Sequence, residues 1–323
     1  MAYITGFCRA YTDYIIPIDS DDVLREFGVE KNTSSMVDMN VLKGCIERFN
    51  GEFVAGGPVA NSMAVISALG GQAAFIGKIA DDEAGRFFQD AFDKASVVFK
   101  SKPYLKKDVG SGLCVIFISP DGSRTMLFNR GVVDNILKSD VIEAEDFLQD
   151  SNILFAGFPA RDGSVDAVFN EIRALAPNAK VATSLQAFDN LSGDIAMLTA
   201  KLLVGRASIV FGNEYEFFLF AKALGYRDLK ELSKSYSEKI FCNTIGEKGV
   251  LVAHDGYLHE TSSYPTNVID TTGAGDAFAG GFLYGLNVGK NLEEASKIGA
   301  YCASQIIGQY GARPKTSLCM PEL

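Results

Sequence analysis

Residues 270–282 read DTTGAGDAFAGGF. The small residues Gly273, Ala274 and Gly275 stand just before an apolar run, which predicts a loop that opens into a helix. Because these residues carry little or no side chain, their backbone N–H groups can approach a ligand closely. Free N–H groups at the N-terminus of a helix favour an anion. We therefore expect an anion-binding turn here, followed at once by the carboxylate of Asp276.

A carboxylate beside an anion site has a clear chemical use. Phosphoryl transfer needs donors for the phosphoryl oxygens and a base for the attacking hydroxyl. Asp276 is the candidate base, and the N–H groups of residues 273–275 are the candidate donors. The same residues also suit an ordinary helix start with an acid in its first turn. The short G-A-G-D pattern alone leaves both interpretations open.

The unbroken run from Asp270 to Asp276 resembles the signature of the PfkB/ribokinase family of carbohydrate and nucleoside kinases, written DTxGAGD. The resemblance implies a ribokinase-like α/β fold, ATP and Mg²⁺ as cofactors, and Asp276 as general base. In members activated by a monovalent cation, the places of Asp270 and Thr272 help to hold K⁺. The resemblance extends from about residue 6 to residue 314, most of the chain.

Composition limits the class of protein. A net charge of −10 and a pI near 4.8 argue against a nucleic-acid partner or an anionic membrane surface. Six scattered cysteines without a CxxC pair fit a reducing cytoplasm rather than a disulfide framework or a zinc site. The N-terminus lacks the basic segment of a signal peptide, and no apolar run approaches the roughly 20 residues that span a bilayer. We expect a cytoplasmic protein that acts on a small molecule.

Strand-like and helical patterns alternate from about residue 60, without a low-complexity linker. This alternation predicts one domain over residues 1–323, with a mostly parallel sheet and helices on both faces. Strands are expected at 74–79, 153–158, 181–185, 209–212, 240–244 and 249–253, and helices at 61–69, 83–94, 165–175, 195–203, 215–223 and 229–239.

Two segments break this alternation. Residues 14–18 are prone to β-structure, and the strand-like runs 113–118 and 125–128 flank the turn sequence SPDGS. The pattern predicts an antiparallel hairpin, either in a separate small sheet or as an extension of the main one. We expect a β-lid built from about 13–18 and 112–129, which would close over the substrate and exclude water. Whether two lids pair into a homodimer is left open.

A second pair of glycines precedes the helix expected at 61–69. Gly56 and Gly57 allow a close backbone approach to a small polar ligand, and Asn61 offers both donors and an acceptor. On their own, these residues equally suit a tight turn capped by an asparagine. In the resembled family, a GG…N element at this place binds the hydroxyl groups of a sugar.

The resemblance implies two further contacts to the acceptor. A carboxylate at the place of Asp13 grips two sugar hydroxyls in the family, and an arginine often follows the hairpin turn, as Arg124 does here. The lead-in to Asp13 departs from the family pattern, because Gly6–Ala10 replace a Gly-Asn-Pro type of sequence. The exact sugar contacts are therefore open.

Other motifs point to the nucleotide side. Asn213 and Glu216 match the NxxE element of the family, which positions Mg²⁺ through water, and they also fit a helix capping box. Residues 243–249 resemble the T-x-G loop that faces the nucleotide, and Gly311–Pro314 resemble the closing loop. The resemblance thus assigns ATP binding to Asn213, Thr244, Gly246, Gly273 and Gly275.

Other chemistries find less support in the sequence. The chain has neither a Walker GxxxxGK[ST] motif nor a GxGxxG that follows a strand. Its only histidines, His254 and His259, flank the turn-like Asp255-Gly256, where solvated hairpin residues are expected. A Ser-His-Asp hydrolase or a histidine-rich metal site is therefore not expected.

The acceptor is the open question. Phe27–Lys31 and residues 209–216 look like the adenosine-kinase branch, whereas Asn129–Gly131 would suit a hexose. Phe158 and Phe188 are candidates to stack on a base, or else core residues. We expect transfer to a primary hydroxyl of an adenosine-like ribonucleoside, with a sugar such as ribose or fructose as the alternative. A non-catalytic regulator that binds a sugar or nucleoside is a third hypothesis, against which the intact base and anion turn argue.

Overall fold

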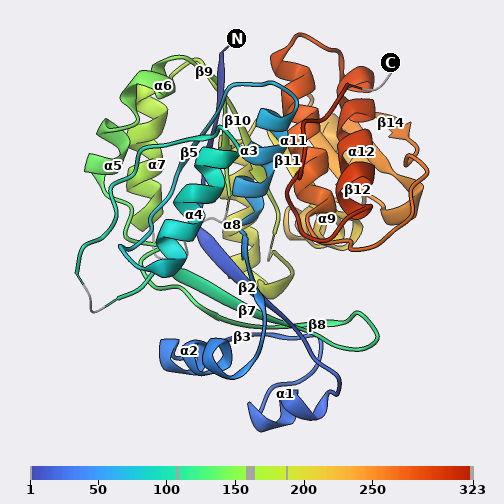
Figure 1. The fold of residues 1–323 in the computed structure, drawn as a ribbon. Helices are drawn as coiled ribbons and strands as arrows, with labels where there is room; N and C mark the ends of the chain where they lie inside the picture. Colours follow the sequence, from blue (N-terminus) through green and yellow to red (C-terminus); the bar gives the residue numbers. More distant parts are fainter. Residues whose placement is uncertain (1, 107–108, 158–163, 187, 321–323) are drawn as a thin grey trace.

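The computed structural model describes residues 2–106, 109–157, 164–186 and 188–320 (Figure 1). Two β-sheets divide these residues into a large body and a smaller layer, which lies below the body in this view. The strands of the large sheet are β1 (Tyr3–Phe7), β5 (Ala73–Ile76), β6 (Val98–Phe99), β9 (Ser151–Ala156), β10 (Lys180–Ser184), β11 (Ile209–Asn213), β12 (Ile240–Thr244), β13 (Val250–His254) and β14 (Tyr257–Thr261).

Helices cover both faces of the large sheet, as predicted from the alternating pattern. The helices are α3 (Pro58–Ala68), α4 (Glu83–Lys94), α11 (Ala274–Asn287) and α12 (Leu292–Ile307) on one face, and α5 (Lys138–Ile142), α6 (Glu145–Gln149), α7 (Ser164–Leu175), α8 (Gly193–Arg206), α9 (Glu214–Ala223) and α10 (Leu229–Ser235) on the other. Within the described residues, no helix has the length and apolar character needed to cross a membrane.

The large sheet runs in the order β14-β13-β12-β11-β10-β9-β1-β5-β6. Its strands are parallel from β6 to β12, while β13 and β14 add an antiparallel hairpin at one edge. Strand β1 pairs with β5 on one side and with the later strand β9 on the other, so the order of strands reverses direction at β1. In open α/β sheets, ligands bind beyond the carboxyl ends of strands at such a switch point.

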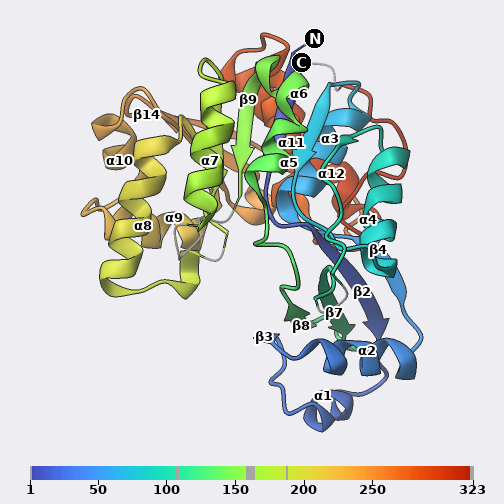
Figure 2. The same cartoon turned by 90° about the vertical axis from the view of Figure 1, so that its left-hand side faces the viewer.

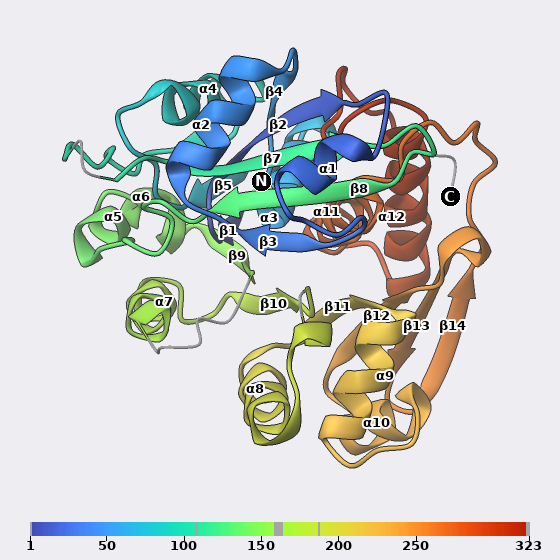
Figure 3. The same cartoon turned by 90° about the horizontal axis from the view of Figure 1, so that it is seen from below.

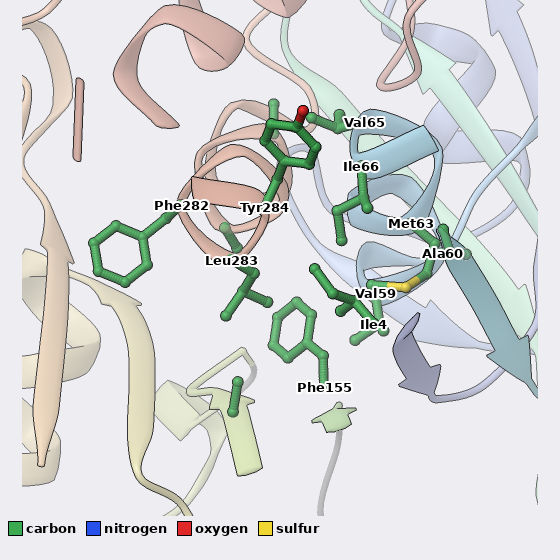
Figure 4. Close-up of a cluster of buried hydrophobic side chains, with 14 of the residues drawn as sticks. Ile4, Val59, Ala60, Met63, Val65, Ile66, Phe155, Phe282, Leu283 and Tyr284 are labelled. Carbon is green, nitrogen blue, oxygen red and sulfur yellow. The ribbon is translucent and has the colours of Figure 1, made fainter. Parts of the chain in front are cut away.

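Aromatic and branched side chains fill the space between the sheet and its helices (Figure 4). Val59 and Met63 of α3 point toward Phe155 of β9 and Leu283 of α11. All four side chains are at most 2 % exposed. Burial of each such side chain stabilises the fold by about 1.5–3 kcal/mol. This packing fixes α3 against α11, the two helices that carry Asn61 and Asp276.

The smaller sheet has five strands in the order β3-β8-β7-β2-β4. Helices α1 and α2 cover the face that points away from the body (Figures 2 and 3). Leu24 of α1 and Leu42 of α2 are buried with Phe117 of β7 in a separate hydrophobic core. The elements of this layer are α1 (Asp22–Glu26), α2 (Met39–Arg48), β2 (Tyr11–Pro17), β3 (Ser34–Met36), β4 (Glu52–Ala55), β7 (Gly112–Ile118) and β8 (Arg124–Asn129).

The structure confirms the predicted hairpin. Strands β7 and β8 pair antiparallel, and the turn between them closes with a 2.9 Å hydrogen bond from the Ser119 N–H to the Ser123 carbonyl. Because this hairpin lies in the smaller sheet, the alternative of an extension to the main sheet was wrong. Strand β2 begins at Tyr11, two residues before the expected lid segment, and β3, β4, α1 and α2 were not predicted.

Most predicted elements of the body are present with shifted ends. Helix α4 has its predicted bounds, while α3 begins three residues early because Pro58 suits the first turn. Helix α10 ends at Ser235 instead of 239, and β5 ends at Ile76 instead of 79. The strand expected at 153–158 ends at 156, and Phe158 lies outside the described residues.

Candidate active site

The turn that we expect to bind an anion lies at the N-terminus of α11. Gly273 caps the helix with φ +76°, a left-handed conformation that favours glycine. A Cβ atom on Gly273 would lie 2.5 Å from the Cβ of Ala312, so a larger residue would also push the closing loop away. Both constraints explain why this position of the signature is a glycine.

The first turn of α11 offers backbone donors. The Ala274 N–H donates to the Thr271 carbonyl over 3.3 Å, and the Ala277 N–H donates to Gly273 over 2.8 Å. In the described structure, the N–H groups of Gly275 and Asp276 have no backbone acceptor. A Cβ atom on Gly275 would meet no atom within 4 Å, so open space surrounds this turn. Free donors in open space at a positive helix end fit a phosphate group.

The carboxylate of Asp276 is held from two sides. Its Oδ2 accepts a 2.9 Å hydrogen bond from Nδ2 of Asn61, and its Oδ1 accepts a 3.0 Å bond from Nε2 of Gln186. The Ser62 hydroxyl donates to the Asp276 backbone carbonyl over 2.7 Å. Burial raises the pKa of Asp276 to about 6, against the lowering effect of the two amide donors. A carboxyl group with a pKa near neutrality suits a general base.

Asp13 of β2 lies against the glycine pair that precedes α3. Burial raises its pKa to about 7; the Arg313 charge opposes this rise and the Asp276 charge adds to it. A Cβ atom on Gly56 would lie only 2.3 Å from Oδ2 of Asp13, so the glycine makes room for the carboxylate. Gly57 caps α3 with φ +89°, which explains the second glycine of the pair.

Arg313 joins these elements from the closing loop. Its Nε donates to Oδ1 of Asn61 over 3.1 Å, and its Nη2 donates to the Gly56 carbonyl over 3.0 Å. Burial lowers the pKa of Arg313 to about 9, although the charges of Asp13 and Asp276 act in the other direction. The guanidinium group thus joins Asn61 to the glycine turn before α3.

Asp270 and Thr272 pair with each other in the anion turn. Oδ1 of Asp270 accepts from the Thr272 N–H over 2.9 Å and from its hydroxyl, while Oδ2 accepts from the Gly311 N–H over 3.0 Å. Burial by itself would raise the pKa of Asp270, but these hydrogen bonds lower it. The Arg124 guanidinium, on β8 of the smaller sheet, donates to the Thr272 hydroxyl.

Asn213 and Glu216 form a reciprocal capping box at the start of α9. The Glu216 N–H donates to Oδ1 of Asn213 over 2.9 Å, and the Asn213 N–H donates to Oε2 of Glu216 over 2.8 Å. Burial raises the pKa of Glu216, and the charge of Glu216 in turn raises the pKa of Asp276. Glu216 therefore caps α9, and its charge also acts on Asp276.

The T-x-G loop follows β12. The Thr244 hydroxyl donates to the Gly212 carbonyl over 3.4 Å, which ties the loop to the end of β11. Gly246 has φ +63° in the short 3₁₀ turn Gly246–Lys248, a conformation that favours glycine. Thr244 is the last residue of β12, and Gly246 follows it by two residues, beside the strand that ends at Asn213. The loop stands at the edge of the sheet where ligands of such folds bind.

Sequence reasoning missed two residues of this site. Gln186 follows the carboxyl end of β10 by two residues, a position that itself marks ligand sites in parallel sheets. Arg313 was noted only as part of the closing loop, and its contacts depend on a long-range approach to Gly56. Phe188 is a core residue, 2 % exposed and packed edge-on against Phe220, so it does not stack on a ligand here.

The remaining candidates lie outside this cluster. The Asn129 amide donates to the Val37 carbonyl over 2.7 Å, and Arg130 pairs with Asp134 at 3.3 Å. His254 and His259 lie on the two strands of the predicted β13–β14 hairpin. Five of the six cysteines are buried, and none forms a disulfide. The described residues contain no cluster of histidine, cysteine and acidic side chains that could hold a metal ion.

Comparison with known proteins places these features in a family. The model of the pfkB family carbohydrate kinase matches residues 35–318. An uncharacterized sugar kinase from Archaeoglobus fulgidus is 29 % identical over 256 residues, 77 % of this chain and 96 % of that protein. The 5-dehydro-2-deoxygluconokinase of Listeria innocua is 25 % identical over 272 residues, 81 % of this chain and 82 % of that protein.

The fold matches solved structures over nearly its whole length. The crystal structure of adenosine kinase from Sinorhizobium meliloti superposes with a TM-score of 0.81 and 27 % identity. The match covers 98 % of this chain and 97 % of that chain. The predicted ribokinase-like fold, with a large mostly parallel sheet and a second smaller one, is therefore confirmed.

Proposed function

The chain belongs to the pfkB family of carbohydrate kinases, and on that premise we propose that Asp276 is the general base of its phosphoryl transfer. As a member of this family it is a phosphotransferase that acts on a sugar hydroxyl. The observation that carries the proposal is the Asp276 carboxylate, held by Asn61 and Gln186 beside free donors at the start of α11. A base at this position can take the proton of the acceptor hydroxyl.

The acceptor would lie between Asp13 and Asp276. Asp13, Gly57 and Asn61 would bind its other hydroxyl groups. In support, Asn61 contacts Asp276, and the Asp276 charge acts on Asp13. Gly56 gives the Asp13 carboxylate the room that a larger side chain would fill. Held in this way, the primary hydroxyl faces the anion turn, and orientation lowers the barrier to transfer.

The kinases of this family use ATP and Mg²⁺. Bound MgATP would supply the γ-phosphoryl group, and its phosphates match the free N–H groups and open space around Gly275. Gly273 shapes this turn, while Asn213, Thr244 and Gly246 would hold the nucleotide along the strand ends. Glu216 would orient water on the metal, since its charge acts on Asp276 and a carboxylate can hold Mg²⁺ through water.

Two further roles near the anion turn are part of the proposal. Asp270 and Thr272 would take part in a K⁺ site, although donors from Thr272 and Gly311 already engage the Asp270 carboxylate. Arg124 would bind a phosphate or the acceptor, because its guanidinium reaches the anion turn from the smaller sheet. Its contact with Thr272 links that sheet to the turn.

We propose an adenosine-like ribonucleoside as the acceptor. The support is the superposition on adenosine kinase over 98 % of this chain. The polar groups of Asn129 and Arg130, which would suit a hexose, are engaged within the protein. A sugar is the second candidate, since relatives by sequence include a 5-dehydro-2-deoxygluconokinase. The six cysteines, none in a disulfide, support a cytoplasmic location.

We also propose that the smaller sheet is a lid. Arg124 on β8 contacts Thr272, so this sheet reaches the anion turn from the other side of the site. The expected test is hydrogen exchange: amides of β7 and β8 should gain protection when the acceptor binds. Equal exchange with and without acceptor would show a fixed sheet. Light scattering would test whether the lids of two copies pair into a homodimer.

An acceptor panel tests the proposed function. Purified protein with ATP and Mg²⁺ should phosphorylate adenosine faster than ribose, fructose or 5-dehydro-2-deoxygluconate. A tenfold preference for a sugar, equal to about 1.4 kcal/mol in transition-state binding, would overturn the acceptor assignment but leave the phosphotransferase in place. No turnover of ATP with any acceptor would instead indicate the non-catalytic regulator.

A further inference from the structure

Arg313 occupies an unusual place for a charged side chain. Its guanidinium carbon lies 5.5 Å from the ring centre of Phe88 and 4.9 Å from that of Phe92. Both phenylalanines lie on α4 and are fully buried. A planar guanidinium gains from contact with aromatic faces, so the two rings fix its position. Its Nη1 is buried and has no hydrogen-bond partner within the described structure.

The hydrogen bonds of Arg313 decide how the Asn61 amide points. Nε of Arg313 donates to Oδ1 of Asn61 over 3.1 Å. With the amide oxygen engaged by a cation, Nδ2 is the group that faces Asp276, and it donates to Oδ2 over 2.9 Å. The reversed amide would set a carbonyl oxygen against a carboxylate and an N–H₂ group against a guanidinium, both of them repulsive.

We propose that Arg313 is a positioning residue for Asp276, which it orients through the amide of Asn61. This inference rests on the proposed role of Asp276 as general base. A second bond, from Nη2 of Arg313 to the Gly56 carbonyl at 3.0 Å, ties the same guanidinium to the glycine turn before α3. The closing loop is thereby coupled to both the base and the acceptor side of the site.

The charge of Arg313 has a second effect on the same site. Burial raises the pKa of Asp276 to about 6 and that of Asp13 to about 7, and the positive charge of Arg313 opposes both shifts. Without this charge, both carboxyl groups would hold their protons to higher pH. A base that is protonated cannot accept the hydroxyl proton. The fall in rate at low pH, called the acid limb of the pH–rate profile, therefore depends on the charge of Arg313.

The alternative is a purely structural anchor for the C-terminal segment. The Arg313 carbonyl accepts a 2.6 Å hydrogen bond from Nε2 of Gln309, and the Leu318 N–H donates to the Ala68 carbonyl over 2.8 Å. Loss of such an anchor would lower the unfolding temperature. It would change neither the protonation of Asp276 nor the orientation of the Asn61 amide. The two roles therefore differ in what a variant changes.

The experiment compares Arg313→Met, Arg313→Lys, Asn61→Ala and the double variant Arg313→Met/Asn61→Ala, with full pH profiles of kcat and KM. We expect Arg313→Met to lower kcat by about 10–100-fold and to move the acid limb up by about one pH unit. Arg313→Lys keeps the positive charge but loses the planar set of N–H donors. It should therefore return the acid limb to the parent's pH and recover only part of kcat.

The double variant tests whether Arg313 acts through Asn61. If it does, adding Arg313→Met to Asn61→Ala should cost little further kcat at the pH optimum. Independent losses that multiply, or an acid limb unmoved in both Arg313 variants, would overturn the proposal and leave the structural anchor. Turnover retained in a folded Asp276→Asn protein would instead refute the role of Asp276, which separates the two failures.

Arg173 provides the matched control. Its Nη1 donates to the Ala176 and Ala179 carbonyls over 2.8 and 2.6 Å, at the end of α7. It is likewise an arginine that ties down backbone carbonyls, but it has no contact with Asn61 or Asp276. Arg173→Met should lower the unfolding temperature and leave kcat and the acid limb unchanged. Circular dichroism on every variant confirms that the compared proteins are folded.

Discussion

The amide of Asn61 donates a 2.9 Å hydrogen bond to the Asp276 carboxylate, although 215 positions separate the two residues in the chain. The helices that carry them, α3 and α11, touch along their backbones. A Cβ atom on Gly280 would lie 2.7 Å from the Ser62 carbonyl, so a glycine lets α11 approach α3 this closely. The orientation of the Asp276 carboxylate is therefore built into the packing of two helices.

Replacing Gln186 should weaken catalysis without unfolding the protein. Gln186→Ala removes the 3.0 Å hydrogen bond to Oδ1 of Asp276. The carboxylate keeps its bond to Asn61 but loses one of two orienting donors, so we expect kcat to fall by about tenfold. The acid limb of the rate profile should move to higher pH, because a donor that favours the ionised form is gone.

The control for this variant is Gln89→Ala. Gln89 also donates to a carboxylate, Oδ1 of Asp93 at 3.0 Å, but it lies on the exposed side of α4. Its replacement should leave kcat and the pH profile as they are. A Gln186→Ala protein with the parent's kcat would show that Asn61 alone suffices to orient the base.

The rate should fall as the pH is lowered through about 7 and then about 6. These are the values to which burial raises the pKa of Asp13 and Asp276, and both carboxylates must be ionised to grip and deprotonate the acceptor. The measurement is kcat/KM between pH 5 and pH 9. A flat profile down to pH 5 would contradict the assignment of both residues.

Stability should show the opposite dependence on pH. The pKa of Asp13 is raised from 3.8 to about 7 in the folded state. Its contribution to stability is therefore fully present below about pH 3.8 and is lost as the pH rises through about 7. The side chain of the Asp13→Asn variant cannot ionise. The stability of this variant relative to the parent should therefore rise between pH 5 and pH 8, by on the order of 1 kcal/mol or more. Urea unfolding at both pH values measures this difference.

Two glycines of the anion turn should respond differently to alanine. Gly273→Ala forces a side chain to φ +76° and against Ala312, so it should cost about 1–3 kcal/mol of stability along with activity. Gly275→Ala has open space for its methyl group, so the unfolding temperature should hold. The methyl group stands beside the free N–H groups, and KM for ATP should rise several-fold. An unchanged KM would argue against an anion site at this turn.

The sequence was informative where a local pattern carries the structure. Strand and helix alternation gave the parallel sheet, and the SPDGS turn marked the β7–β8 hairpin. The smaller sheet was only half predicted, because β3 has three residues and β4 has four, too few for a period-2 pattern. Helices α1 and α2 precede the region of regular alternation and bury only Leu24, Leu42 and Cys45.

The sequence predicted those residues of the candidate site that stand in short local motifs. Asp276, Asn61 and Gly273 stand in short local signatures, and the structure brings Asn61 against Asp276. The contacts of Gln186 and Arg313 join segments far apart in the chain, and no local pattern encodes such an approach. Their roles could be seen only once the sheet placed the strand ends together.

Glu216→Gln separates a metal role from a capping role. Glutamine can still accept from the Asn213 N–H, so the capping box and the fold should persist. If the carboxylate orders water on Mg²⁺, the Mg²⁺ concentration for half-maximal rate should rise. A parent-like Mg²⁺ dependence would leave Glu216 with the cap alone.

The central claim is that Asp276 takes the proton of the acceptor hydroxyl. Asp276→Asn keeps the shape and polarity of the side chain but cannot act as a base, and loss of a general base typically costs about 10²–10⁴ in rate. The most direct measurement is kcat of this variant, together with calorimetric binding of ATP and of the acceptor. We predict a collapse of kcat by that factor with near-normal binding of both. A folded Asp276→Asn protein whose kcat stays within a few-fold of the parent would contradict the mechanism.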